Sequence, residues 1–129
     1  MCIRDRSEGD AIDFGNLTQG RSHPGACNSS TRSLVAAGYG PNYRNEIDYV
    51  EIATIGNSVD FGDATNNVGG CAAMASPTRA VFAGGYGHPA FRNDIFYVEI
   101  MTTGNALDFG DQTVKRDRLS ACSNGHGGL

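Results

Sequence analysis

The sequence predicts an all-β fold built from a repeated unit of four short strands. A ten-residue phrase begins at Gly104 and has close copies that begin at Gly56 and at Gly9, about 48 residues apart. Within each interval, short runs of β-favouring residues are separated by turn residues. No window of about ten or more residues has apolar side chains at helical spacing, so helical repeats are excluded.

The repeat divides the chain into units at about 11–57, 58–105 and 106–129, the last of which stops roughly halfway. Four strands in each period are the content of a β-propeller blade. We therefore expect a partial β-propeller with two full four-stranded blades and a partial blade at each end. Because a ring of four to eight such blades needs roughly 190 to 390 residues, we also expect a truncated chain that is oligomeric or poorly soluble when expressed alone.

The strands follow one another in the same order in each unit. In the middle unit the predicted strands are 70–75, 79–84, 94–102 and 106–109. Turn residues separate them at Ser76-Pro77, at 84–89 and at Gly104-Asn105. The run 95–100 is apolar on both faces apart from Glu99, as expected for a strand in a sheet that is packed between two neighbouring sheets.

Residues that recur at one repeat position are expected to be structural, because an active site is needed once whereas a turn or a packing contact is needed in every unit. The phenylalanine of each Asp-Phe-Gly is expected to fill the space between blades, and the acids that flank it are expected to cap turns. Calcium binding by these acids is the alternative, although their paired spacing lacks the ligand density of known loops. The structural set comprises Asp13, Phe14, Tyr49, Asp60, Phe61, Gly84, Gly85, Tyr97, Asp108 and Phe109.

The same residues resemble the kelch repeat. Val81-Phe82-Ala83-Gly84-Gly85 matches its strand with a glycine pair, Tyr97 matches its tyrosine, and Phe109 stands in place of its tryptophan, whereas the first unit departs from the pattern with Ala37-Gly38. The resemblance covers residues 9–129 and implies a propeller. Phrases such as IDYVEIATIGNSVDFGD are also similar to repeats in proteins of marine bacteriophages, which implies a virion or tail-fibre component in a virion or extracellular location.

Residues 1–8 are expected to be non-native or disordered, because MCIRDR resembles a translated sequencing adapter of metagenomic gene predictions. Among the cysteines, Cys27 and Cys122 share a repeat position with Met74, which favours apolar packing over a disulfide or a ligand role. No CxxC pair or zinc-ligand spacing is present, so we expect no metal.

Charge argues against two classes of partner. The formal net charge is −4, from 14 acidic and 10 basic residues. Because such a chain has no broad positive field, we expect neither nucleic acid nor a membrane as a partner. The basic cluster at 115–118 is interpreted as a solvated turn. No stretch approaches the run of about 18 apolar residues that spans a bilayer.

Candidate binding residues lie in the loops. Tyr39, Tyr43, Tyr86 and Phe91 are loop aromatics that could stack on sugars, although packing at the blade ends explains them about equally well. His88 lies in the loop after Gly-Tyr-Gly, where the two full units differ in length and sequence, as a binding surface would. No catalytic constellation and no cofactor motif is present.

The sequence therefore predicts a non-enzymatic structural or interaction module. By resemblance it belongs to a phage virion or tail fibre and presents its loops to a host-surface glycan or protein, with other propeller blades or further copies of itself as partners. One alternative is a fragment of a kelch-type enzyme domain, similar to galactose oxidase, that lacks the active-site loops. Another is an intracellular kelch scaffold. Fold alone does not choose among them.

Overall fold

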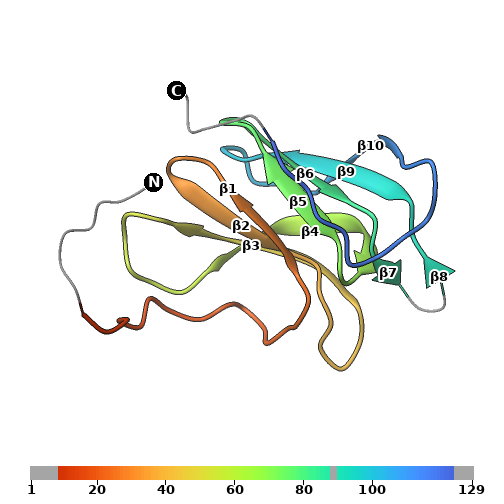
Figure 1. The fold of residues 1–129 in the computed structure, drawn as a ribbon. Coiled ribbons are helices and arrows are strands. Elements are labelled where there is room, and N and C mark those ends of the chain that lie inside the picture. Colours follow the sequence, from red (N-terminus) through yellow and green to blue (C-terminus); the bar gives the residue numbers. More distant parts are fainter. Residues whose placement is uncertain (1–8, 88–89, 124–129) are drawn as a thin grey trace.

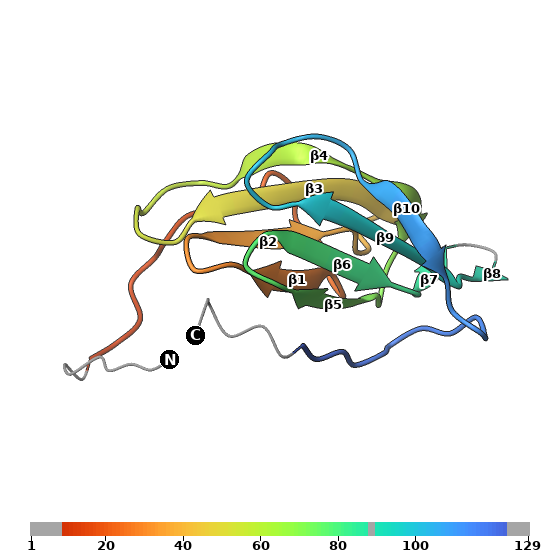
Figure 2. The same ribbon diagram turned by 90° about the horizontal axis from the view of Figure 1, so that it is seen from above.

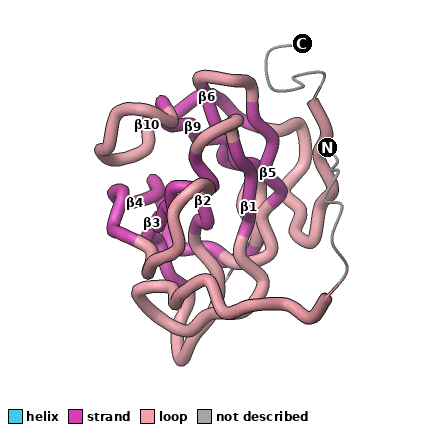
Figure 3. Tube along the Cα trace, turned by 90° about the vertical axis from the view of Figure 1, so that its left-hand side faces the viewer, coloured by secondary structure: helices cyan, strands magenta, loops and turns pink. Residues whose placement is uncertain are grey.

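The computed structural model of the chain describes residues 9–87 and 90–123, and these are all-β, with no helix (Figure 3). This confirms the predicted class. Ten strands are present in the described residues (Figure 1): β1 (Gly25–Asn28), β2 (Arg32–Ala36), β3 (Arg44–Glu51), β4 (Val59–Val68), β5 (Ala72–Ala75), β6 (Arg79–Ala83), β7 (Tyr86–Gly87), β8 (Ala90–Phe91), β9 (Asp94–Glu99) and β10 (Leu107–Asp111).

Eight of the strands form two four-stranded antiparallel sheets of the same design. The first sheet has the order β1-β2-β3-β4 and the second has the order β5-β6-β9-β10, so within each sheet every strand pairs with the preceding strand of that sheet. Neither sheet closes on itself. The four strands predicted for the middle unit are thus present, and the first unit repeats them.

The turn between the first two strands of each sheet is fixed by a serine. In the second sheet, Ser76 N donates to Arg79 O at 2.8 Å, and Ser76 Oγ accepts from Arg79 N at 3.1 Å. Ser29 and Arg32 make the same pair of contacts in the first sheet. A short hydroxyl side chain that bonds its own turn explains why the Ser-x-Thr-Arg phrase recurs.

The two sheets pack face to face, with β1 lying against β5 (Figure 2). Phe82 and Phe96 stack at 5.3 Å on the face of the second sheet. Burying a large apolar side chain stabilises the folded state by about 1.5–3 kcal/mol, so this interface is the main source of stability. Its largest fully buried apolar side chains are Leu34, Ile47, Val68, Phe82, Phe96 and Ile100.

A β-bulge sets the position of the repeated phenylalanine. The pairing of β4 with β3 shifts between Asp60 and Gly62, and the pairing of β10 with β9 shifts between Asp108 and Gly110. The phenylalanine between each of these pairs is therefore the extra residue, which is left out of the ladder. Phe61 is 3% exposed because it lies between the two sheets, as expected, whereas Phe109 lies on the outer side of the second sheet and is 55% exposed.

Arginine, tyrosine and glutamate recur because they form one surface cluster in each sheet. The guanidinium of Arg32 lies 4.3 Å from the centre of the Tyr49 ring, and its Nε donates to Glu51 at 2.6 Å. Stacking on the ring and pairing with the carboxylate hold the arginine in one orientation. The second sheet repeats this cluster with Arg79, Tyr97 and Glu99.

The glycine pair after β6 is required by close approach of other segments. Gly84 has φ +70°, and a Cβ there would lie 2.7 Å from Leu119 Cδ1. Gly85 has φ +107°, and its Cβ would lie 3.0 Å from Gly69 O. In the first unit Ala37 occupies the equivalent of Gly84 and adopts φ +62°, so the backbone keeps the glycine geometry despite the departure from the kelch pattern.

Three features differ from the expectations. The segment predicted as a turn at 84–89 contains β7, which pairs with β8 in a small hairpin. The recurring acids of the two sheets lie inside β4 and β10 rather than in turns. The expected partial blades do not form: β10, in the unit 106–129, belongs to the second sheet, and the described residues 9–24 and 112–123 contain no strand, only an isolated bridge from Ser22 to Tyr39. Residues 1–8, for which a non-native origin was expected, lie outside the described residues.

Candidate functional site

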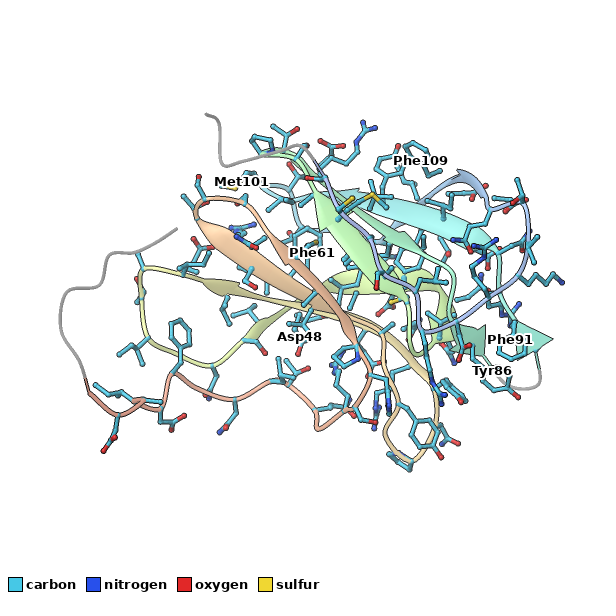
Figure 4. The ribbon with its side chains drawn as sticks, viewed as in Figure 1. Asp48, Phe61, Tyr86, Phe91, Met101 and Phe109 are labelled. Atoms are coloured by element: carbon cyan, nitrogen blue, oxygen red, sulfur yellow. The ribbon has the colours of Figure 1, made fainter. Side chains whose placement is uncertain are left out.

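Four of the five predicted binding residues meet at one end of the sheets. Tyr39 and Tyr43 lie in the connection between β2 and β3 and form a bridge with each other. Tyr86 in β7 pairs with Phe91 in β8, and Figure 4 shows these two side by side. The fifth residue, His88, lies outside the described residues. The two connections come from different sheets, so the fold itself assembles this cluster, here called the aromatic end.

The rings of the aromatic end form a continuous series. The ring centres of Tyr39 and Tyr43 are 4.8 Å apart, those of Tyr43 and Tyr86 are 5.3 Å apart, and those of Tyr86 and Phe91 are 5.1 Å apart. All three pairs are edge-to-face, the geometry that brings the positive edge of one ring to the negative face of the next. Tyr39 and Phe91, at the two ends of the series, are 43% and 48% exposed. The series therefore offers aromatic surface to a ligand as well as packing internally.

The ring of Tyr43, in the middle of the series, packs closely against the backbone of Gly69. A Cβ at Gly69 would lie 3.2 Å from two carbons of the Tyr43 ring. Burial raises the pKa of the Tyr43 phenol, and the neighbouring phenols of Tyr86 and Tyr39 raise it further. The phenol therefore stays protonated at neutral pH and can both donate and accept a hydrogen bond.

Charged side chains border a cavity beside the rings. The cavity has a volume of about 130 Å³ and is lined by the three tyrosines together with His23, Gly69, Gly70, Asp117 and Arg118. The backbone holds its wall together, because Gly70 N donates to His23 O and Arg118 N donates to Gly70 O, both at 2.8 Å. Aromatic rings beside a carboxylate, a guanidinium and an imidazole make a site that can both stack on a ligand and bond its polar groups.

His23, Gly70 and Arg118 occupy the same position in three successive repeat units, and all three have positive φ. Their φ angles are +55°, +74° and +53°. Only glycine adopts this conformation without cost, so His23 and Arg118 carry backbone strain of order 1 kcal/mol each. The two units that keep a side chain here place it at the cavity, and strain of this kind is characteristic of functional positions.

A second, polar cleft adjoins the first and shares Tyr43 with it. Its volume is about 640 Å³, and its other lining residues are Asn42, Asn45, Thr65, Asn66, Asn67 and Arg92. Among the described residues, Arg92 Nε is buried without a hydrogen-bond partner. Amide side chains carry both donors and acceptors, so this cleft suits a neutral ligand with many hydroxyl or amide groups.

The sequence identified the rings but not the polar residues around them. The basic cluster at 115–118 is solvated, as predicted, since the side chain of Arg118 is 79% exposed, but Asp117 and Arg118 also line the cavity. The signal that marks His23 and Arg118 is their alignment with Gly70, which shows two bulky residues at a glycine position. Among the recurring residues, Tyr49, Tyr97, Gly84 and Gly85 serve packing, while Asp13 and Phe14 lie in the extended segment before β1.

The cysteines of the described residues are unpaired thiols. Cys27, Cys71 and Cys122 are free. Burial raises the pKa of Cys27 to about 12 and that of Cys71 to about 11. Both thiols are therefore protonated at neutral pH, and a protonated thiol is a poor nucleophile. Cys27 packs against the apolar core, as its repeat position predicted.

In the described part of the chain no group of three or more His, Cys, Asp or Glu side chains is placed to hold a metal ion. A search of the same residues for a helix long and apolar enough to cross a membrane finds none.

No protein-family model matches the chain, and no curated protein matches it.

Proposed function

We propose that this chain is a non-enzymatic interaction module of the propeller type whose aromatic end binds a glycan. The observation that carries the proposal is the series of four aromatic rings beside a cavity bordered by His23, Asp117 and Arg118. The C–H groups of a sugar ring carry partial positive charge and pack on the negative face of an aromatic ring. Its hydroxyl groups bond to carboxylate, guanidinium and amide side chains.

The arrangement of the two sheets supports a propeller-type setting. Each sheet is a four-stranded meander with its first strand lying beside the first strand of the other sheet, as in neighbouring blades around an axis. Loops from both sheets then gather at one end of the stack, which is where the four rings lie. The likeness of the repeated phrases to those of phage proteins supports a place on a virion, where this end would face a glycan or protein of the host surface.

The test is a glycan array probed with the labelled full chain, followed by calorimetry with each glycan retained. Phe91→Ala removes exposed aromatic surface at one end of the series and is expected to weaken binding about two- to tenfold, because an aromatic contact contributes on the order of 0.5–1.5 kcal/mol. Met101→Ala, which trims a side chain of similar exposure outside the cluster, is the matched control and should bind as the wild type does.

A second pair of variants separates binding from folding. His23→Gly and Arg118→Gly relieve backbone strain, so each is expected to keep or raise the free energy of unfolding by up to about 1 kcal/mol. Each also removes a polar side chain from the cavity wall and should weaken glycan binding. If the array retains no glycan, or if Phe91→Ala and Arg118→Gly bind as tightly as the wild type does, the proposal is contradicted.

A further inference from the structure

One contact, here called the stitch, ties the start of one repeat phrase to the end of the phrase before it. The first stitch joins the segment 56–58 to the segment 14–16. Gly56 N donates to Phe14 O at 2.9 Å, and Ser58 N donates to Asn16 O at 2.9 Å. The side chain of Asn57 completes the stitch, because its Oδ1 accepts from Asn16 N at 2.9 Å.

The second stitch repeats the first, one unit later. Gly104 N donates to Phe61 O at 2.8 Å, and Ala106 N donates to Asp63 O at 2.7 Å. Asn105 Oδ1 accepts from Asp63 N at 3.0 Å. The stitch is therefore a property of the repeat. Its donor segment is Gly-Asn followed by a small residue, and its acceptor segment, in the preceding phrase, is Phe-Gly followed by Asn or Asp.

The glycine in the acceptor segment is what admits the donor. A Cβ at Gly15 would lie 2.2 Å from Gly56 O, and a Cβ at Gly62 would lie 2.1 Å from Gly104 O. No side chain fits at these distances. The recurring Asp-Phe-Gly is explained by both parts of the contact, since the phenylalanine fills the space between units and the glycine lets the next unit come close.

The chain also carries one acceptor segment and one donor segment of the stitch type that make no stitch with any described residue. The segment 109–111 has the acceptor sequence Phe-Gly-Asp, yet Gly110 has no atom of another segment within 4 Å of its Cβ position. Phe109 is 55% exposed, whereas Phe61 in the stitched copy is 3% exposed. At the other end, the segment 9–12 begins the first phrase, and its Ile12 is 83% exposed.

We propose that Phe109–Asp111 of one chain binds the segment 9–11 of a second copy in a third stitch. The donor sequence fits, because Gly9 matches Gly104 and Ala11 matches Ala106. The contact joins two different surfaces, so it is head-to-tail, and each copy keeps one free donor and one free acceptor for further copies. The partner is thus another molecule of the same chain, held by main-chain hydrogen bonds and by cover over the Phe109 ring.

One residue of the donor differs from the internal stitches. Asp10 stands where Asn57 and Asn105 stand. A carboxylate accepts the same hydrogen bond, but it brings a negative charge next to Asp111 of the acceptor segment, and like charges side by side weaken pairing. The natural contact is therefore weaker than the internal ones, and Asp10→Asn is expected to tighten it by up to about fivefold.

Sedimentation of the full chain across a range of concentrations tests the proposal. The wild type is expected to associate with rising concentration, and Asp10→Asn is expected to do so at a concentration lower by up to about fivefold. Ala11→Arg places a bulky charge in the donor, and Phe109→Asp removes the ring from the acceptor, so each should stay monomeric. The matched controls are Ser30→Arg and Val114→Asp, which change exposed residues outside both segments and should associate as the wild type does.

Mixing the two disrupted variants tests the head-to-tail geometry. Ala11→Arg keeps a working acceptor and Phe109→Asp keeps a working donor, so an equimolar mixture should form a dimer and nothing larger. A wild type that stays monomeric at every concentration overturns the proposal. So do association that survives both disrupting variants, or a mixture that remains monomeric.

Discussion

Phe61 and Phe109 occupy the same repeat position but have different surroundings. Each ring meets a tyrosine of the neighbouring strand edge-to-face, at 5.8 Å for Phe61 with Tyr49 and at 5.9 Å for Phe109 with Tyr97. Phe61 is then covered by the second sheet, whereas no described residue covers Phe109 in the same way. Because Phe61 and Phe109 have the same local sequence, a difference in what each ring contributes to stability reports its burial between the sheets.

Truncation of the two rings is therefore expected to have unequal costs. Phe61→Ala should lower the free energy of unfolding by about 3–5 kcal/mol, since it leaves a cavity between the sheets. Phe109→Ala should lower it by about 1 kcal/mol or less, because an exposed ring loses little on removal. Urea unfolding of both variants measures the difference, and equal losses would contradict the assignment of Phe61 to the interface.

Single residues show where sequence reasoning succeeds and where it stops. The loop aromatics Tyr39, Tyr43, Tyr86 and Phe91 were identified as a set, because large rings in glycine-rich loops stand out. Their edge-to-face contacts depend on which loops the fold brings together, and that is long-range information. The role of Asn105 was also missed: it was assigned to a turn, whereas its side chain caps a segment 42 residues away.

Arg21 and Asp48 form a buried pair that the next unit replaces with apolar residues. Their side chains are 0% and 1% exposed, and the guanidinium lies 3.4 Å from the carboxylate. Arg21 also donates to Glu46 O at 2.9 Å, and Asp48 accepts from Thr18 N at 2.9 Å. The equivalent positions one unit later are Val68 and Phe96, both in the apolar core.

Replacing both Arg21 and Asp48 by the apolar residues of the next unit is expected to cost little stability, whereas removing only one of them is expected to cost much more. Arg21→Val alone should lower the free energy of unfolding by about 3–5 kcal/mol, because Asp48 is left buried without its cation. The double variant Arg21→Val with Asp48→Phe copies the next unit and should recover most of that loss or exceed the wild type. Urea unfolding of both variants tests this. If the double variant is no more stable than Arg21→Val alone, the surroundings of Arg21 and Asp48 are not equivalent to those of Val68 and Phe96.

At the scale of strands, the sequence predicted most of what is found. Runs of β-favouring residues and the turn residues between them placed the four strands of the middle unit close to β5, β6, β9 and β10. The hairpin of β7 and β8 was missed, because each strand has two residues and glycine dominates the segment. The bulges were missed as well, since a bulge is a property of pairing between strands and leaves little local signal.

For the whole molecule, the repeat predicted that successive units are similar sheets and that their apolar faces need cover. Both follow from one physical fact: a four-stranded sheet that is apolar on two faces is stable only when each face is packed. The sequence did not predict how the sheets hold together, because the stitch uses backbone groups and one asparagine. The recurrence of glycine and asparagine in each phrase could not show which segments pair, because the paired segments lie more than 40 residues apart in the sequence.

The most direct test of this account is hydrogen exchange of the stitch amides in the monomeric chain at low concentration. The amides of Gly56, Ser58, Gly104 and Ala106 are hydrogen-bonded between units, so they should exchange at least about a hundredfold more slowly than the equivalent amides of Gly9 and Ala11. Exchange of Gly104 and Ala106 as fast as that of Gly9 and Ala11 would show that the units are not joined in this way and would contradict the account.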